Sequence, residues 1–206
     1  MNIPTPADFQ TLRTKYADPK TKEDLEKLEM TQPILLHYTK DDLKKMFTEQ
    51  EERALRDVQA TGYDSAWAEL EENHESLLMW TSRAWLEDMF QATKVWKNGI
   101  PLGADGMFNF VKGHTNNAVI VTFGTKSNYL DQEKGEKRQN FRYFGLALYK
   151  GENTTAIVSQ YAVYRTLAKE MFGVEFPQVV VWNSDDHRAY QTMRHVCFPR
   201  SSFASA

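Results

Sequence analysis

Asp185, Asp186 and His187 are three adjacent residues whose side chains can ligate a metal ion or exchange a proton. They stand at the start of a predicted helix, where adjacent side chains point in different directions. Acidic residues also favour the first turn of a helix because they complement its dipole. We therefore interpret this cluster as a helix start and expect no metal, with a metal site as the alternative.

Two histidines and one cysteine are further candidates for chemistry. His37 and His74 are each followed two residues later by a hydroxyl side chain, a pattern found in two-histidine phosphoesterases. His74 falls in a predicted helix rather than a strand, so we interpret the match as coincidence. Cys197 is the only cysteine, which excludes an internal disulfide and a cysteine-rich zinc site. We expect it to pack as a small apolar residue.

Thr154, Thr155 and Ala156 open a predicted helix that directly follows a predicted strand. Backbone amides at such a helix start bind anions and phosphates. Asn153 or Thr154 has the side chain of a helix cap, whereas Glu152 adds an unfavourable negative charge. If the protein binds a phosphate or a coenzyme, we expect it at these amides.

Hydrophobic periodicity and turn residues predict the elements that position these residues. They are a strand at 32–38, helices at 39–59 and 65–96, strands at 107–112, 118–124 and 141–149, a helix at 154–172, a strand at 178–182 and a helix at 186–196. The predicted order is β-α-α-β-β-β-α-β-α-(β), and residues 125–140 are read as a charged loop. Short loops join the middle strands and helices join the later ones, so we predict an α/β (α+β mixed sheet) fold.

The strand at 141–149 and the strand at 178–182 flank the predicted helix at 154–172. A strand, a crossover helix and a second strand form a βαβ unit. We therefore predict that these two strands are parallel neighbours, with the helix packed across one face of the sheet.

Domain organisation follows from the change in composition near residue 32. Residues 1–31 are polar and turn-rich with one short helix at 20–29, and we interpret them as an N-terminal polar arm. Residues 32–206 are long enough for a single domain with a sizeable core. Trp80, Trp85 and Trp96 fall in the predicted helix 65–96, which we interpret as a possible protein-binding face.

Composition limits the partners of this chain. A formal net charge of −3 gives no whole-molecule attraction to nucleic acid or anionic membrane, so neither is an expected partner. Two local basic clusters survive that argument: residues 134–138 and the set Arg188, Arg194, His195 and Arg200. No apolar run approaches the ~20 residues of a membrane span, and the first residues lack the pattern of a signal peptide. We expect a cytoplasmic protein.

From residue 32 to 198, about four-fifths of the chain, the order of elements resembles the GNAT superfamily of N-acetyltransferases. ILLHYTKDDLKKMF (34–47) is similar to the opening strand and first helix of that family. VVVWNSDDHRAYQTMRHVCF (179–198) is similar to its fifth strand and fourth helix. The second segment also resembles acetyltransferase-like internal virion proteins of short-tailed bacteriophages, which implies a phage virion as a second possible location.

The resemblance implies acetyl-CoA as cofactor. The amides of Thr154, Thr155 and Ala156 would hold the coenzyme A pyrophosphate, and a backbone amide near Leu146 and Leu148 would polarise the thioester carbonyl. Family members carry Gln/Arg-x-x-Gly-x-Gly/Ala at the helix start, whereas this chain has a single glycine there.

The resemblance also implies a tyrosine as general acid. The family position corresponds to Met193, and Tyr190 lies one turn earlier, from where it would protonate the leaving thiolate. Only eight residues follow Phe198, too few for the full last hairpin of the family. Two functions follow as alternatives: transfer of an acyl group from acyl-CoA to an amine of a small molecule or protein, or a catalytically inactive GNAT-like virion or host-interaction protein.

Overall fold

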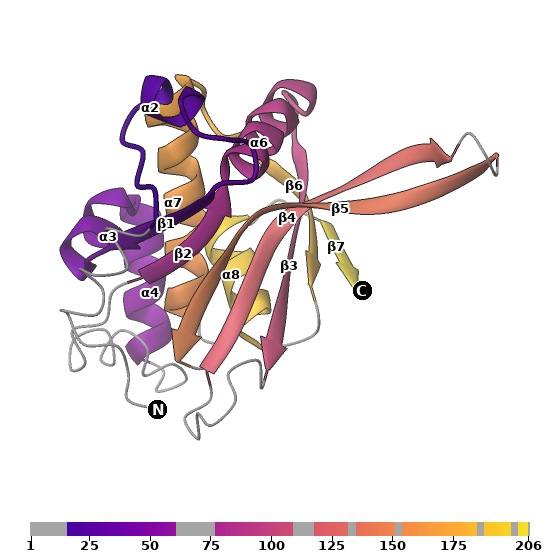
Figure 1. Ribbon diagram of the computed structural model, residues 1–206. Helices are drawn as coiled ribbons and strands as arrows, with labels where there is room; N and C mark the ends of the chain where they lie inside the picture. Colours follow the sequence, from indigo (N-terminus) through magenta and orange to yellow (C-terminus); the bar gives the residue numbers. More distant parts are fainter. Residues whose placement is uncertain are drawn as a thin grey trace.

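The computed structural model describes residues 16–60, 77–108, 118–131, 135–150, 154–184, 188–198 and 202–205. Its elements are α2 (Lys22–Glu26), β1 (Pro33–Tyr38), α3 (Lys40–Met46), α4 (Glu49–Ala60), β2 (Leu77–Ser82), α6 (Arg83–Val95), β3 (Ile100–Phe108), β4 (Ala118–Asp131), β5 (Glu136–Lys150), α7 (Thr154–Phe172), β6 (Val179–Ser184), α8 (Arg188–Cys197) and β7 (Ser202–Ser205). The predicted mixed α/β class is confirmed (Figure 1). None of the helices in these ranges combines the length and apolar content of a membrane span.

The described strands form one seven-stranded sheet in the order β1-β2-β5-β4-β3-β6-β7. Pairing is antiparallel from β1 to β3 and parallel between β3, β6 and β7. The prediction that strands 141–149 and 178–182 are neighbours is wrong, because β4 and β3 lie between β5 and β6. β2 and β4 occupy the two edges of β5, so β6 pairs with the free edge of β3.

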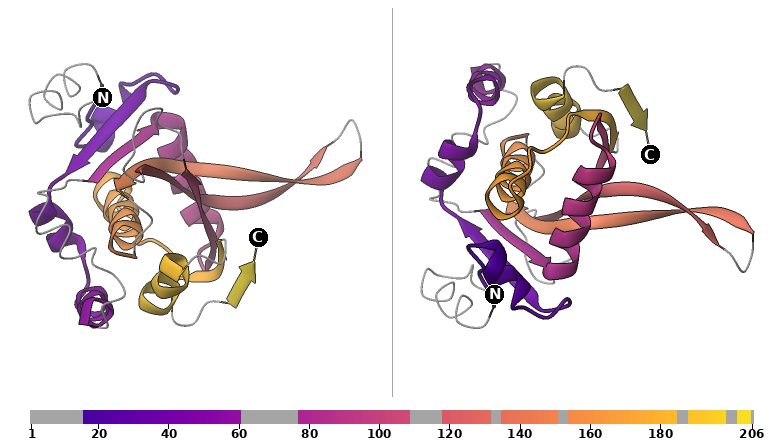
Figure 2. Two further views of the ribbon diagram at one scale, coloured as in Figure 1. Left: turned by 90° about the horizontal axis from the view of Figure 1, so that it is seen from below. Right: turned by 90° about the horizontal axis from the view of Figure 1, so that it is seen from above.

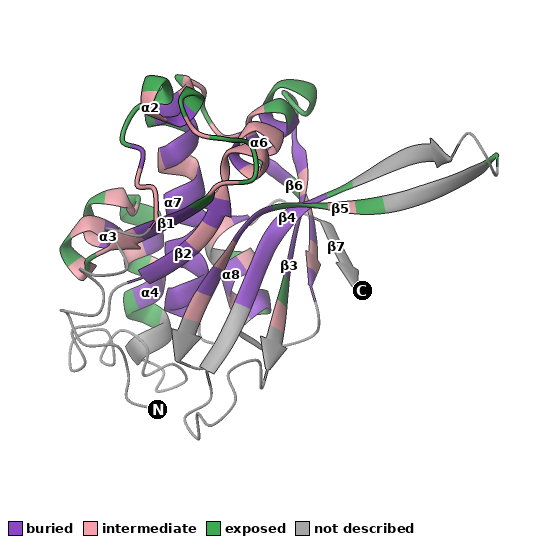
Figure 3. Ribbon diagram, viewed as in Figure 1, coloured by how far each residue is buried: buried purple, intermediate pink, exposed green. Residues whose placement is uncertain are grey.

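The helix between β5 and β6 has the predicted limits, residues 154–172. Its N-terminal two thirds are buried almost all round, between the sheet and the helices α3, α4 and α8 (Figures 1 and 3). The ring of Tyr164 contacts Phe123 of β4 and Phe144 of β5, with centroids 5.7 and 6.0 Å away. Such a helix, apolar on several sides, is typical of the centre of a domain.

The prediction of one long helix at 65–96 is wrong. Residues 77–82 form β2 and the helix α6 begins only at Arg83, while residues 61–76 lie outside the described ranges. β2 pairs with β1 on one side and β5 on the other, and a strand enclosed in this way is a continuous apolar run that periodicity cannot distinguish from a helix. Trp80 therefore lies on β2, Trp85 in α6 and Trp96 at its C-cap, so no single tryptophan-rich helix presents them.

The helix predicted at 39–59 is two helices, α3 and α4, separated at Phe47 and Thr48. Thr39 caps α3 as predicted: its hydroxyl accepts a hydrogen bond from the Asp42 amide at 3.2 Å, and Asp42 accepts one from the Thr39 amide at 3.0 Å. The Thr39 hydroxyl also donates to Asp42 Oδ2 at 2.6 Å, and this bond, together with that from the Thr39 amide, holds the pKa of Asp42 below its ordinary value. At the start of α4, Thr48 and Glu51 form the same reciprocal pair of hydrogen bonds. Each of the two helices therefore has its own N-cap.

The antiparallel pairing predicted for strands 107–112 and 118–124 is confirmed at Met107 and Phe108, which pair with Ile120 and Val119. The limits of the first strand are wrong, because β3 begins at Ile100, and residues 109–117 lie outside the described ranges. The charged loop predicted at 125–140 is wrong. β4 and β5 continue through it and pair from Thr125 with Arg142 to Asp131 with Glu136. We call residues 125–131 of β4 and 136–142 of β5 the ribbon; it projects from the sheet in Figures 1 and 2. Strand pairs that leave the sheet do not need the apolar alternation that marks most strands, and the sequence of the ribbon lacks it.

Residues 16–31, the described part of the predicted N-terminal arm, pack on the domain. Leu25 of α2 is buried, and the Leu35 amide donates to the carbonyl of Ala17 at 3.1 Å. The domain boundary at residue 32 stays a prediction.

Candidate functional site

The predicted anion site lies at the first turn of α7. Thr154, Thr155 and Ala156 are all buried, and the Ser159 hydroxyl donates to the Thr155 carbonyl at 2.7 Å. The proposed cap Asn153 falls outside the described residues. Because these side chains are enclosed by the protein, they offer little surface to a ligand.

The predicted thioester site lies in the middle of the sheet. Leu146 pairs with Trp80 of β2 on one side and Thr122 of β4 on the other, and Leu148 pairs with Leu78 and Ile120. Both leucines are half-buried. A thioester can therefore approach this backbone only from a face of the sheet, since neither edge of β5 is open here.

Tyr190, the predicted general acid, is fully buried in α8 and its ring lies 6.3 Å from that of Trp182 on β6. Met193, at the family's tyrosine position, is also fully buried. β6 is three strands from β5 in the sheet order, which corresponds to about 14 Å at the usual strand spacing. The chain joins Leu148 to the start of α7, but Tyr190 packs on a different strand.

The other candidates from the sequence do not converge either. His37 is half-buried on β1, while His74 and the set Asp185, Asp186 and His187 fall outside the described residues. Within the described ranges, no group of three or more His, Cys, Asp or Glu side chains is placed to hold a metal ion.

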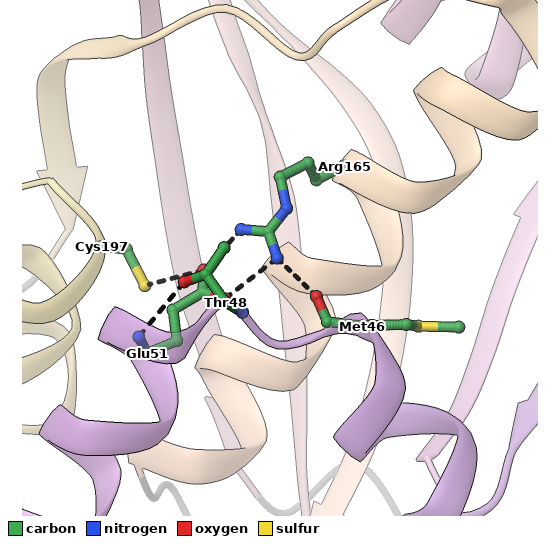
Figure 4. A network of polar contacts seen from close by, with 5 residues as sticks. All are labelled: Met46, Thr48, Glu51, Arg165 and Cys197. Atoms are coloured by element: carbon green, nitrogen blue, oxygen red, sulfur yellow. Dashed lines mark hydrogen bonds and ion pairs between the residues drawn. The ribbon is translucent and has the colours of Figure 1, made fainter.

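A polar cluster that the sequence did not predict joins α4, α7 and α8 (Figure 4). Arg165 of α7 donates to both carboxylate oxygens of Glu51 at 2.5 and 2.9 Å, and to the Met46 carbonyl at 2.6 Å. Glu51 also accepts the Thr48 amide at 2.8 Å, and the thiol of Cys197 lies 3.9 Å from its Oε1. We call these five residues the Arg165–Glu51 clasp. The Glu51 side chain is only 4% exposed and that of Arg165 23%.

The clasp pairs one positive charge, on Arg165, with one negative charge, on Glu51. Burial lowers the pKa of Arg165, but the hydrogen bonds and charge of Glu51 outweigh it, so the net pKa is raised and the guanidinium stays charged. Burial raises the pKa of the Cys197 thiol, and the Glu51 carboxylate raises it further, so this thiol is a poor nucleophile. The arrangement therefore connects three helices rather than supplying an acid, base or nucleophile.

Half of the clasp has a local signal in the sequence. Thr48 and Glu51 fit the capping-box spacing Thr-x-x-Glu, and the Glu51 amide donates to the Thr48 hydroxyl at 3.2 Å. Arg165 is separated from Glu51 by 114 residues, and no local rule connects them. A hollow beside α4 shares Thr48 with the clasp; it is lined by Thr48, Glu49, Gln50, Arg53, Ala54 and Asp57.

The ribbon is another feature that the sequence did not predict. Its seven residue pairs run from Thr125 with Arg142 to Asp131 with Glu136. Pairing of β4 with β3 ends at Gly124, and pairing of β5 with β2 ends at Leu146. Beyond these points, the two strands pair only with each other among the described residues.

At the base of the ribbon, aromatic side chains anchor it to the sheet. The Phe141 ring lies against Gly103 and Gly124, where a Cβ atom would come within 3.1 and 2.6 Å of it. Tyr143 contacts both Phe141 and Trp85, with ring centroids 5.0 and 5.7 Å away. The ribbon is thus held at one end, and the side chains of Lys126 and Asn140, which follow the base on its two strands, are exposed.

Comparison of the sequence with models of known protein families and with curated proteins found no match.

Proposed function

We propose that this chain is a non-catalytic interaction protein and that the ribbon contacts its macromolecular partner. The observation that carries the proposal is the ribbon, seven residue pairs that extend past every other strand of the sheet. A two-stranded ribbon is at best marginally stable alone and adds little to the core. Its length therefore favours a role outside the fold. A phage virion or the infected host is the setting that the sequence resemblance implies.

The geometry of the predicted catalytic residues supports this choice. Tyr190 is buried against β6, while Leu146 and Leu148 lie on β5 with a strand on either side. A general acid has to come within hydrogen-bonding reach of the group it protonates. Three strands of separation argue against Tyr190 serving a thioester held at β5.

Acyl transfer from acetyl-CoA to an amine is the second candidate. The observation in its favour is that α7 begins at Thr154 directly after β5, as the GNAT resemblance implies. In that case the α7 amides would hold the pyrophosphate and a β5 amide would polarise the thioester.

Thermal unfolding with acetyl-CoA distinguishes the two functions. A cofactor at ~100 times its Kd stabilises the folded state by about 2.7 kcal/mol, which for a chain of this size raises Tm by roughly 5–10 °C. We expect the same Tm with acetyl-CoA as with acetyl-pantetheine, a control that lacks the nucleotide. We also expect no acetyl transfer to a panel of amines. A shift of several degrees, together with transfer that Tyr190→Phe abolishes, would overturn the proposal.

A shortened variant tests the role of the ribbon. Replacing residues 128–139 with Asn-Gly leaves a two-residue turn between the paired residues Ser127 and Asn140. Because Phe141 and its contacts with the sheet remain, we expect the variant to fold with a Tm within about 3 °C of wild type. A large loss of stability would show instead that the ribbon is part of the fold.

A further inference from the structure

The C-terminal turn of α6 exposes two apolar side chains between two lysines. Val95 is 73% exposed and Trp96 is 40% exposed, and the flanking Lys94 and Lys97 are exposed as well. Val180 of β6, which is 37% exposed, adjoins this turn. We call Lys94, Val95, Trp96, Lys97 and Val180 the α6 tip. We propose that the α6 tip docks on the surface of an anionic lipid bilayer.

The local backbone holds the α6 tip at the surface. Ile100 is fully buried at the start of β3, whereas residues 94–98 are all exposed. The Gly99 amide donates to the Trp96 carbonyl at 2.9 Å, which closes the turn. Gly99 has a φ of +146°, a region that favours glycine, and the Val180 side chain occupies the place where a Cβ atom of residue 99 would lie. The turn is therefore anchored on β3 and β6, and its two apolar side chains point outwards.

The charged side chains of the α6 tip are all positive. Residues 89–104 include Lys94 and Lys97 and no acidic residue. The Lys94 ammonium lies 4.0 Å from the centroid of the Phe90 ring, a contact that orients the side chain without neutralising it. Neither ammonium forms an ion pair with another residue in the described part of the chain. Both charges are therefore available to an anionic partner.

Acidic side chains around the α6 tip are already paired. The two acidic residues of α6, Glu87 and Asp88, form ion pairs with arginine side chains at 2.6 and 2.9 Å. Glu175, in the loop before β6, pairs with Lys169 at 3.0 Å. At physiological salt, charges more than about 8 Å apart are largely screened. The charge that an approaching surface meets at the α6 tip is therefore positive, although the whole chain is net −3.

These residue types fit a lipid surface better than a protein interface. Tryptophan is enriched at the headgroup level of membranes, and lysines are attracted to an anionic leaflet. Lysine is depleted in protein interfaces, which bury about 800 Å² on each partner around a packed apolar centre. A turn with three partly exposed apolar side chains does not supply such a centre, whereas a bilayer needs no preformed pocket.

The α6 tip and the ribbon face different directions. The C-terminal end of α6 lies at an outer end of the domain, where Figure 3 shows it exposed, and the ribbon projects to one side in Figure 1. Docking through the α6 tip therefore leaves the ribbon accessible. This inference does not rest on the proposed role of the ribbon.

Co-sedimentation of the full chain with vesicles tests the proposal. Wild type should bind vesicles of phosphatidylcholine with about 30% phosphatidylserine, and should bind pure phosphatidylcholine vesicles at least about fivefold more weakly. Each lysine near an anionic surface strengthens binding about fivefold, so Lys94→Glu/Lys97→Glu should weaken it at least about tenfold. Val95→Ser/Trp96→Ser removes the apolar side chains that enter the interface and should also weaken binding at least about tenfold.

Two controls separate the α6 tip from the rest of the chain. Arg53→Glu/Arg56→Glu on α4 reverses two exposed charges away from the α6 tip and should change the affinity about twofold or less. The variant that lacks residues 128–139 should bind vesicles as wild type does. Because all the substituted side chains are exposed, each substituted variant should keep a Tm within about 3 °C of wild type.

Several results would overturn the proposal. These are no binding to the mixed vesicles, equal binding to both kinds of vesicle, or equal loss in the lysine reversal and the arginine reversal. Normal binding of Val95→Ser/Trp96→Ser would likewise place the lipid contact elsewhere and refute the α6 tip. Light scattering is measured in parallel: a dimer that Val95→Ser/Trp96→Ser dissociates, without vesicle binding, would make a second copy of the chain the occupant and refute the lipid surface.

Discussion

Replacing Arg165 with Met removes the cation that holds the Glu51 carboxylate between α4, α7 and α8. The guanidinium donates three hydrogen bonds, two to Glu51 and one to the Met46 carbonyl, and Glu51 is almost fully buried. Met keeps the aliphatic length of the side chain but leaves the carboxylate with the Thr48 amide as its main donor.

The magnitude follows from burial. Removing one partner of a buried ion pair costs about 3–5 kcal/mol because the other charge stays uncompensated. Arg165 is 23% exposed, so water can partly replace it, and we expect a loss of about 3 kcal/mol. For a chain of 206 residues this lowers Tm by roughly 6–12 °C.

Urea unfolding followed by tryptophan fluorescence measures this loss, with equal m-values as the check that only stability has changed. Arg56→Met is the matched control: it removes an exposed pair with Glu52 on α4 and should cost about 0.5 kcal/mol or less. A double-mutant cycle combines Arg165→Met with Glu51→Leu. The double variant should lose at least about 2 kcal/mol less stability than the sum of the losses in the two single variants. An Arg165→Met loss no larger than that of Arg56→Met, or strictly additive losses, would refute the reasoning.

Two further predictions concern packing and pH. Gly145→Ala should destabilise by about 1–3 kcal/mol, because its Cβ would lie 2.7 Å from the Tyr164 hydroxyl and 3.0 Å from the Trp80 carbonyl; an unchanged Tm would contradict this close approach. The raised pKa of Cys197 stabilises the fold fully below the unfolded thiol's pKa of about 8.5, and this contribution is lost as pH rises towards the folded pKa. Since Cys197 is only partly buried as a residue, wild type should lose up to about 1 kcal/mol more than Cys197→Ala between pH 8 and 9.5; equal losses in urea unfolding would contradict the shift.

The sequence by itself determined the features that depend on a few neighbouring residues. Thr39 and Asp42 define the start of α3 by a reciprocal pair of hydrogen bonds three residues apart. The limits of α7 follow from the turn residues and apolar spacing between 153 and 173. The mixed class follows from the order of short loops and helices. Such signals are local and independent of what the element packs against.

Only the tertiary structure decided which elements meet. Leu77 to Ser82 form a strand because β1 and β5 lie on both sides of them, and β6 pairs with β3 because both edges of β5 are occupied. The partner of Glu51 is 114 residues away, and the burial of Tyr190 depends on Trp182 of another element. The ribbon is a strand pair although it lacks apolar alternation, since backbone pairing with its partner strand can extend a strand beyond the core. Which strands pair, and which charged residues form buried ion pairs, depends on every strand edge and helix face that the rest of the chain offers. A short stretch of sequence does not include these distant partners, so it cannot predict the pairing.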